Sequence, residues 1–96
     1  MEIGEITHDK ENSQLYLEAD GARALIDYKI RNKRMYLTHS EVPIELRGNG
    51  IGKILVEKGL TKLVEEGYDK EYRIIAKCPF IKYVVAKSEK WSEIVE

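Results

Sequence analysis

A glycine-rich segment between Pro43 and Lys53 separates two halves of the chain that differ in how their apolar residues are spaced. Before this segment, apolar and polar side chains alternate, which is typical of strands with one buried face. After it, apolar residues recur at helical spacing, beginning with the run from about Ile51 to Glu66. A strand-rich half followed by a helix-rich half predicts an α+β fold.

The first half predicts four antiparallel strands that follow one another as a meander. The expected strands are Glu2–Thr7, Gln14–Ala19, Ala22–Ile30 and Met35–Val42. Polar turns separate them, at Asp9–Ser13, Asp20-Gly21 and Arg31–Arg34. The Asp-Gly pair is the strongest turn signal, because both central residues of a type I′ turn need a positive φ. The first strand has the weakest pattern, since its apolar residues Ile3 and Ile6 are three positions apart.

The second half predicts two helices with a strand between them. The expected segments are Ile51–Glu66, Tyr72–Ala76 and Phe80–Lys87. Gly67 follows the first helix as its C′ residue, and the strand should run parallel to the fourth strand. Gly52 and Gly59 lie on the apolar face of that helix and cost about 1 kcal/mol each relative to alanine. Their presence there indicates that the backbone approaches a sheet or a ligand closely. The tail Ser88–Glu96 either docks or frays.

Composition narrows the class of protein further. Charged residues make up 34% of the chain, but the 16 lysines and arginines nearly balance the 17 acids, and the formal net charge is −1. This balance argues against binding to nucleic acid or an anionic membrane surface, which needs a surplus of positive charge. No apolar run approaches the roughly 18 residues of a membrane span, and the start of the chain lacks the regions of a signal peptide. We expect a cytoplasmic single domain, residues 1–96, that is a monomer or weak dimer.

The glycine-rich segment itself lies between the end of a strand and the start of a long helix. Backbone N–H groups of a first helical turn lack intrahelical partners, and the helix dipole adds positive potential there. Gly48, Gly50 and Gly52 remove side chains that would block close approach, so the segment suits a phosphate or pyrophosphate. The alternative is a loop that only turns the chain, since Gly-x-Gly alone is a weak signal. A Walker A loop is excluded because Gly52-Lys53 is followed by Ile54, and the Rossmann glycine spacing is absent.

The run Arg47-Gly48-Asn49-Gly50-Ile51-Gly52 matches every specified position of Gln/Arg-x-x-Gly-x-Gly/Ala, the acyl-coenzyme A loop of the GNAT acetyltransferase superfamily. The predicted order of strands and helices is also the core order of that superfamily. In addition, His39-Ser40-Glu41-Val42-Pro43, and Cys78-Pro79-Phe80 followed by Tyr83, resemble a subgroup of small stand-alone GNAT-like acetyltransferases, the YjdJ type. The resemblance covers roughly Ala22 to Lys87.

This resemblance implies a truncated GNAT fold, an antiparallel β-meander followed by α-β-α. The two helices and the C-terminal hairpin that normally shape the acceptor pocket are missing. It also implies acetyl-coenzyme A as the cofactor, with its pyrophosphate on the backbone amides of Arg47, Gly48, Asn49, Gly50, Ile51, Gly52 and Lys53. The pantetheine arm would pair with the end of the fourth strand, at Glu41 and Val42. Without the resemblance, Arg47 would be an ordinary surface arginine.

Cys78 is the sharpest catalytic candidate. It is the only cysteine, so no intrachain disulfide forms, and the two histidines beside it do not make a zinc-type cluster. A lone cysteine is most often a small buried hydrophobe. This one, however, comes just before Pro79, near the N-terminus of the last helix, with Lys77 and Lys82 nearby, and such surroundings favour the thiolate. The resemblance implies a position beside the bound thioester, where Cys78 would accept the acyl group.

Three further residues are candidates for proton transfer. Tyr83 occupies the last helix, where many GNAT enzymes place a tyrosine that protonates the departing thiolate, and its alternative is a half-buried aromatic packed on the sheet. His39 and Glu41 share one strand face by the two-residue period, and either could deprotonate an amine. The alternative for both is a structural role.

Together these inferences predict an acetyl-coenzyme A-binding acetyltransferase that acts on an amine-bearing small molecule or protein, directly or through Cys78. The alternative is a non-catalytic module that binds coenzyme A or a protein partner. The missing acceptor elements favour the module, whereas Cys78 and Tyr83 favour the enzyme.

Overall fold

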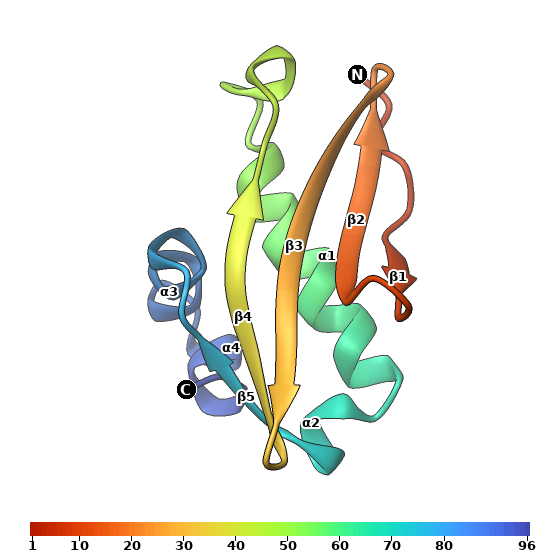
Figure 1. Cartoon of the computed structure of the whole chain (residues 1–96). Helices are drawn as coiled ribbons and strands as arrows, with labels where there is room; N and C mark the ends of the chain where they lie inside the picture. Colours follow the sequence, from red (N-terminus) through yellow and green to blue (C-terminus); the bar gives the residue numbers. More distant parts are fainter.

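The computed structural model describes all residues from 1 to 96 and forms one mixed sheet with helices packed against it (Figure 1). The strands are β1 (Thr7–Asp9), β2 (Gln14–Ala19), β3 (Ala22–Arg31), β4 (Arg34–Glu41) and β5 (Arg73–Ala76). The helices are the 3₁₀ turn η1 (Ile44–Leu46), α1 (Ile51–Glu65), α2 (Tyr68–Glu71), α3 (Pro79–Ala86) and α4 (Glu89–Ile94). The spatial order is β1-β2-β3-β4-β5, and only the β4–β5 pair is parallel. The predicted α+β class, meander and parallel last strand are confirmed.

The first strand differs from the prediction. It spans Thr7–Asp9 instead of Glu2–Thr7, and Ile3 makes only an isolated bridge with Ala19. The reason is His8, whose side chain is 1% exposed. Its Nδ1 lies 2.5 Å from a carboxylate oxygen of Glu66, and its Nε2 lies 2.7 Å from the hydroxyl of Tyr28. Because these partners are distant from His8 in the sequence, the alternation of apolar and polar residues could not locate the strand.

The tail docks. Ser88 caps α4 by accepting a hydrogen bond from the backbone N–H of Trp91 at 3.1 Å, and Trp91 is buried. Val95 then forms a parallel bridge with Ile74. The prediction did not include the short helices α2 and α4, which are too brief to carry a periodic signal.

One face of the sheet is covered and the other is open. Buried side chains on the covered face belong to a single cluster of 22 residues that includes side chains from α1, α3 and α4. Gly59 allows α1 to approach this face, because a Cβ there would lie 3.2 Å from Cδ1 of Ile26. On the opposite face, side chains such as Tyr16, Tyr36 and Ile75 are only partly buried. The adjacent isoleucines Ile74 and Ile75 predict a strand that is buried on both faces, but β5 is buried on one face only: Ile74 is 1% exposed, whereas Ile75 is partly buried.

A β-bulge in β4 reverses the alternation of side chains at Thr38. Tyr28 pairs with Leu37, but the next β3 residue, Asp27, pairs with His39, so Thr38 is the extra residue. Its hydroxyl donates a hydrogen bond to the Asp27 carbonyl at 3.2 Å. Because of the bulge, Leu37 and Ser40 both lie on the covered face, whereas His39 lies on the open face.

No helix combines the length and apolar character needed to cross a membrane.

Candidate functional site

The backbone between β4 and α1 forms an open turn in front of the helix. Gly48 has φ +85° and Gly50 has φ +71°, values that L side chains rarely adopt. A Cβ at either position would meet no atom within 4 Å, so the space in front of the turn is free. Gly50 is also the N-cap of α1 and supplies no side-chain cap. The amides of the first helical turn therefore face this space without an intrahelical acceptor. These features fit an anion such as a pyrophosphate.

A cleft of about 450 Å³ lies at this turn, and we call it the loop cleft. It is lined by Val42, Leu46, Arg47, Gly48, Gly50, Ile51, Gly52, Lys53 and Phe80. Seven of the nine predicted cofactor-binding residues are among them. The other two, Glu41 and Asn49, are not: the Asn49 side-chain amide donates weakly to the carbonyls of Leu46 and Arg47, each at 3.4 Å. Asn49 thus braces the loop.

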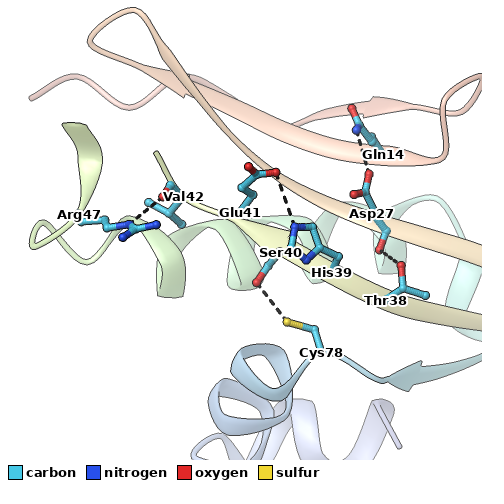
Figure 2. Close-up of polar contacts among 9 residues, drawn as sticks. All are labelled: Gln14, Asp27, Thr38, His39, Ser40, Glu41, Val42, Arg47 and Cys78. Atoms are coloured by element: carbon cyan, nitrogen blue, oxygen red, sulfur yellow. Dashed lines mark hydrogen bonds and ion pairs between the residues drawn. The ribbon is translucent and has the colours of Figure 1, made fainter. Parts of the chain in front are cut away.

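The side chain of Arg47 points back toward the strand. Its Nε donates to the Val42 carbonyl at 3.1 Å, as Figure 2 shows. This bond ties the loop to the end of β4. Arg47 therefore contributes to the cleft partly by stabilising the conformation of the loop.

Cys78 is the N-cap of α3, as the sequence predicts, and is 7% exposed. Its Sγ lies 3.2 Å from the hydroxyl oxygen of Ser40, which points toward it from β4 (Figure 2). Burial raises the pKa of the thiol, but hydrogen bonds from the Ser40 hydroxyl and from the backbone N–H groups of Ile81 and Phe80 outweigh it, so the net pKa is lowered. Neither predicted lysine is among the causes. The thiolate is favoured by hydrogen bonding instead.

Next to Cys78, β4 has an edge with no strand beside it. The parallel pairing ends at Leu37 and Ala76, whereas β4 continues to Glu41. At the point of divergence, the Leu37 carbonyl accepts hydrogen bonds from the N–H groups of both Lys77, at 2.9 Å, and Cys78, at 3.1 Å. Beyond it, no strand pairs with the β5-facing edge of β4, and an extended ligand can add to a strand edge of this kind.

His39 and Glu41 share one face, as predicted, and that face is the open one. Their side chains are 57% and 64% exposed, with Nε2 of His39 3.6 Å from a carboxylate oxygen of Glu41. Ser40 lies between them and points to the opposite, covered face (Figure 2). The two proton-transfer candidates of β4 are therefore separated from Cys78 by the thickness of the sheet.

Tyr83 is also apart from Cys78. It is 60% exposed on α3, and Nζ of Lys87 lies 5.5 Å from the centre of its ring. Tyr83 is five positions after Cys78, a spacing that puts the two residues on different faces of a helix. This exposure contradicts the alternative in which Tyr83 packs half-buried on the sheet, and its role as general acid stays a prediction.

Sequence reasoning missed two residues of this region, Ser40 and Phe80. Ser40 depends on the bulge at Thr38, for which a single sequence carries no signal. Phe80 had a signal in Gly52, because a Cβ at that glycine would lie 2.7 Å from Cζ of Phe80. Gly52 on the apolar face of the helix therefore indicated a close contact, and its partner is the aromatic ring of Phe80.

Comparison with known proteins identifies the family of the chain. The family model of the GCN5-related N-acetyl-transferases matches residues 12–94. Protein NATD1 of Gallus gallus is 37% identical over 65 residues, and Protein NATD1 of Mus musculus is 38% identical over 64 residues. These matches cover 65% and 64% of this chain and 59% and 58% of the relatives, so the chain spans about three fifths of their length. Since the family model covers most of the chain, the protein belongs to the GCN5-related N-acetyltransferase family.

Proposed function

We propose that the loop cleft binds acetyl-coenzyme A and that the protein transfers the acetyl group to an amine. The observation that carries the proposal is the open turn at Gly48 and Gly50, which leaves the amides at the start of α1 free for a pyrophosphate. Membership of an acetyltransferase family supports this choice among phosphate-bearing ligands.

The unpaired edge of β4 is the natural place for the pantetheine arm, whose two amides can exchange hydrogen bonds with a strand edge. Acetyl-coenzyme A supplies an acetyl group activated as a thioester. Backbone N–H groups of the same edge would stabilise negative charge on the carbonyl oxygen during attack.

The acceptor amine would approach from the open face. Glu41 and His39 are exposed there and can take the proton that the amine loses when it becomes an amide, while the carbon–sulfur bond breaks and coenzyme A leaves as a thiolate that takes up a proton from solvent. This direct route uses residues of one strand face, and it does not need Cys78.

A second route is favoured by the hydrogen bonds to Cys78. Its sulfur would take the acetyl group as a new thioester, while the coenzyme A sulfur leaves and gains the proton that the cysteine thiol lost. An amine would then take the acetyl group from Cys78 and restore the thiol. The lowered thiol pKa supports this route, because the thiolate is the nucleophile.

The alternative function is a module that binds coenzyme A or a protein without turnover, which the uncovered sheet face favours. One experiment separates the possibilities. Acetyl-coenzyme A is titrated into the labelled protein, amide shifts are followed by NMR, and free thiol release is then measured with a panel of amines. We expect shifts at Gly48–Lys53 and amine-dependent thiol release. Shifts without thiol release would support the module, and shifts confined to the β2–β3 hairpin would refute the site.

A further inference from the structure

The open face of the sheet carries a concentration of positive charge at the end that holds the β3–β4 turn. The segments Lys29–Arg34 and Arg73–Lys77 hold six of the 16 basic residues of the chain and none of its 17 acidic residues. Figure 1 shows this turn next to β5. In the rest of the chain, acidic residues clearly outnumber basic ones, so the charge of this corner is a local property.

The strand register places three of these basic residues in one row. Arg31 pairs with Arg34 across the β3–β4 hairpin, and Arg34 pairs with Arg73 across the parallel β4–β5 pair. Directly paired residues of neighbouring strands point to the same face of a sheet. Arg34 is two positions before Tyr36, whose side chain lies on the open face, so the three arginines lie on that face as well. We call Arg31, Arg34 and Arg73 the arginine row.

A partly apolar strip lies directly beside the arginine row. Lys29 pairs with Tyr36, and Tyr36 pairs with Ile75. Nζ of Lys77 lies 5.8 Å from the centre of the Tyr36 ring. Tyr36 and Ile75 are partly buried, so they give this cationic surface an apolar floor. Such a surface offers contacts to the side chains of a polypeptide as well as to its charges.

The stability of the fold does not explain the arginine row, because like charges directly opposite each other on neighbouring strands are destabilising. Of the six basic residues, only Arg73 forms an ion pair, and its partner is Glu96. Nε of Arg73 donates to one carboxylate oxygen at 2.8 Å, and a second guanidinium nitrogen donates to the other oxygen. This paired geometry is the one in which arginine recognises carboxylates. Arg31 and Arg34 present the same group without a partner.

We propose that the arginine row docks an acidic, extended segment of a partner protein, with carboxylates of that segment on Arg31 and Arg34. Charge complementarity selects an acidic partner. The small extent of the row selects a short segment, because a nucleic acid or an anionic bilayer would extend beyond it onto the acidic remainder of the molecule. Asp27 and Glu41 already lie farther along the same face. The inference does not depend on the proposed function, since no residue of the row lines the loop cleft.

The test measures the fluorescence anisotropy of a labelled peptide of alternating glutamate and serine. In extended form this peptide places its carboxylates on one side. It should bind, with an affinity that falls as salt is added, whereas the same peptide with glutamine in place of glutamate should not bind.

Arg34→Gln should weaken the glutamate peptide about fivefold, as expected for loss of one exposed ion pair. The thermal unfolding midpoint of this variant should not fall, because repulsion within the row is relieved. Arg23→Gln is the matched control: Arg23 is exposed on β3 but lies at its other end, paired with Glu18, so affinity for the peptide should be retained.

Glu96→Gln should change the affinity in the opposite direction. It removes the carboxylate that Arg73 holds, so the glutamate peptide should bind more tightly. Glu93→Gln is its control, because Glu93 is exposed on α4 and forms no ion pair. Absence of binding by the glutamate peptide, or unchanged affinity in Arg34→Gln, would overturn the inference. Tighter binding of a single-stranded oligonucleotide or of phosphatidylserine vesicles, lost in Arg34→Gln, would overturn the choice of a protein partner.

Discussion

The loop cleft and the Ser40–Cys78 pair lie at neighbouring points of the molecule but are built from different groups. The loop cleft presents backbone amides, held in place by positive φ at two glycines and by the start of α1. The cysteine site presents two side chains that meet because a bulge turns Ser40 onto the covered face. One site depends on where side chains are absent, and the other depends on which side chains face each other.

This difference teaches how each site should fail. A backbone site tolerates the loss of side chains but is blocked by the gain of one. A side-chain site is lost by the removal of a single atom while its surroundings stay folded. Substitutions that add atoms to the loop and remove atoms from the cysteine site therefore test the comparison directly.

The largest effect is expected from Gly50→Val. The new side chain would enter the open space in front of α1 and displace the pyrophosphate, so affinity for acetyl-coenzyme A should fall about a hundredfold or more, as for the loss of two charge-assisted hydrogen bonds. Gly67→Val is the control, because Gly67 has φ +80° and is also an N-cap with free space around it, but lies outside the loop cleft. Equal loss of affinity in the two variants would assign the effect to backbone strain.

A second large effect concerns the chemistry of Cys78. Incubation with acetyl-coenzyme A should add one acetyl group that hydroxylamine removes, and Cys78→Ser should abolish this adduct while retaining affinity, because the loop cleft does not include residue 78. Mass spectrometry of the intact protein measures the adduct. An adduct that persists in Cys78→Ser, or none in the unaltered protein, would exclude the cysteine route and leave the direct one.

A smaller effect is expected from Ser40→Ala. The hydroxyl hydrogen bond helps to lower the thiol pKa, so its removal should raise that pKa and reduce the thiolate fraction near pH 7. Ultraviolet thiolate absorbance across a pH series measures the midpoint without requiring access to the sulfur. Ser40→Thr, which keeps the hydroxyl, should restore the lower midpoint, and Thr61→Val, which removes a hydroxyl bonded within α1, should not move it. An unchanged midpoint in Ser40→Ala would show that the backbone N–H groups at the start of α3 are enough to lower the thiol pKa.

The smallest effect should come from Arg47→Ala. Its guanidinium contacts the Val42 carbonyl, and the phosphate contacts are expected from amides, so affinity for coenzyme A should fall only about twofold to fivefold. Calorimetric titration checks this. A loss as large as that of Gly50→Val would mean that the side chain, not the backbone, holds the pyrophosphate, and the contrast between the two sites would disappear.

The same contrast explains what could be predicted from sequence. The loop was predictable because glycine spacing and its position between a strand and a helix are local properties, and the N-cap position of Cys78 was local as well. The contact of Cys78 with Ser40 was not, because it depends on a single extra residue in β4. The anchoring of β1 through His8 was missed for a similar reason, since its partners lie 20 and 58 residues away.

The ends of the sheet have a consequence for self-association. Beyond β5, the Glu96 backbone exchanges two hydrogen bonds of 2.8 Å with Ile74 and Ala76, and the Glu96 carboxylate accepts from Nε of Arg73 at 2.8 Å. The opposite outer strand, β1, is only three residues long. Short or covered outer strands give a second copy little backbone on which to add a strand, so edge-to-edge pairing of sheets between copies is disfavoured. The β5-facing edge of β4 beyond Leu37 is then the part of this sheet that can pair with an extended ligand.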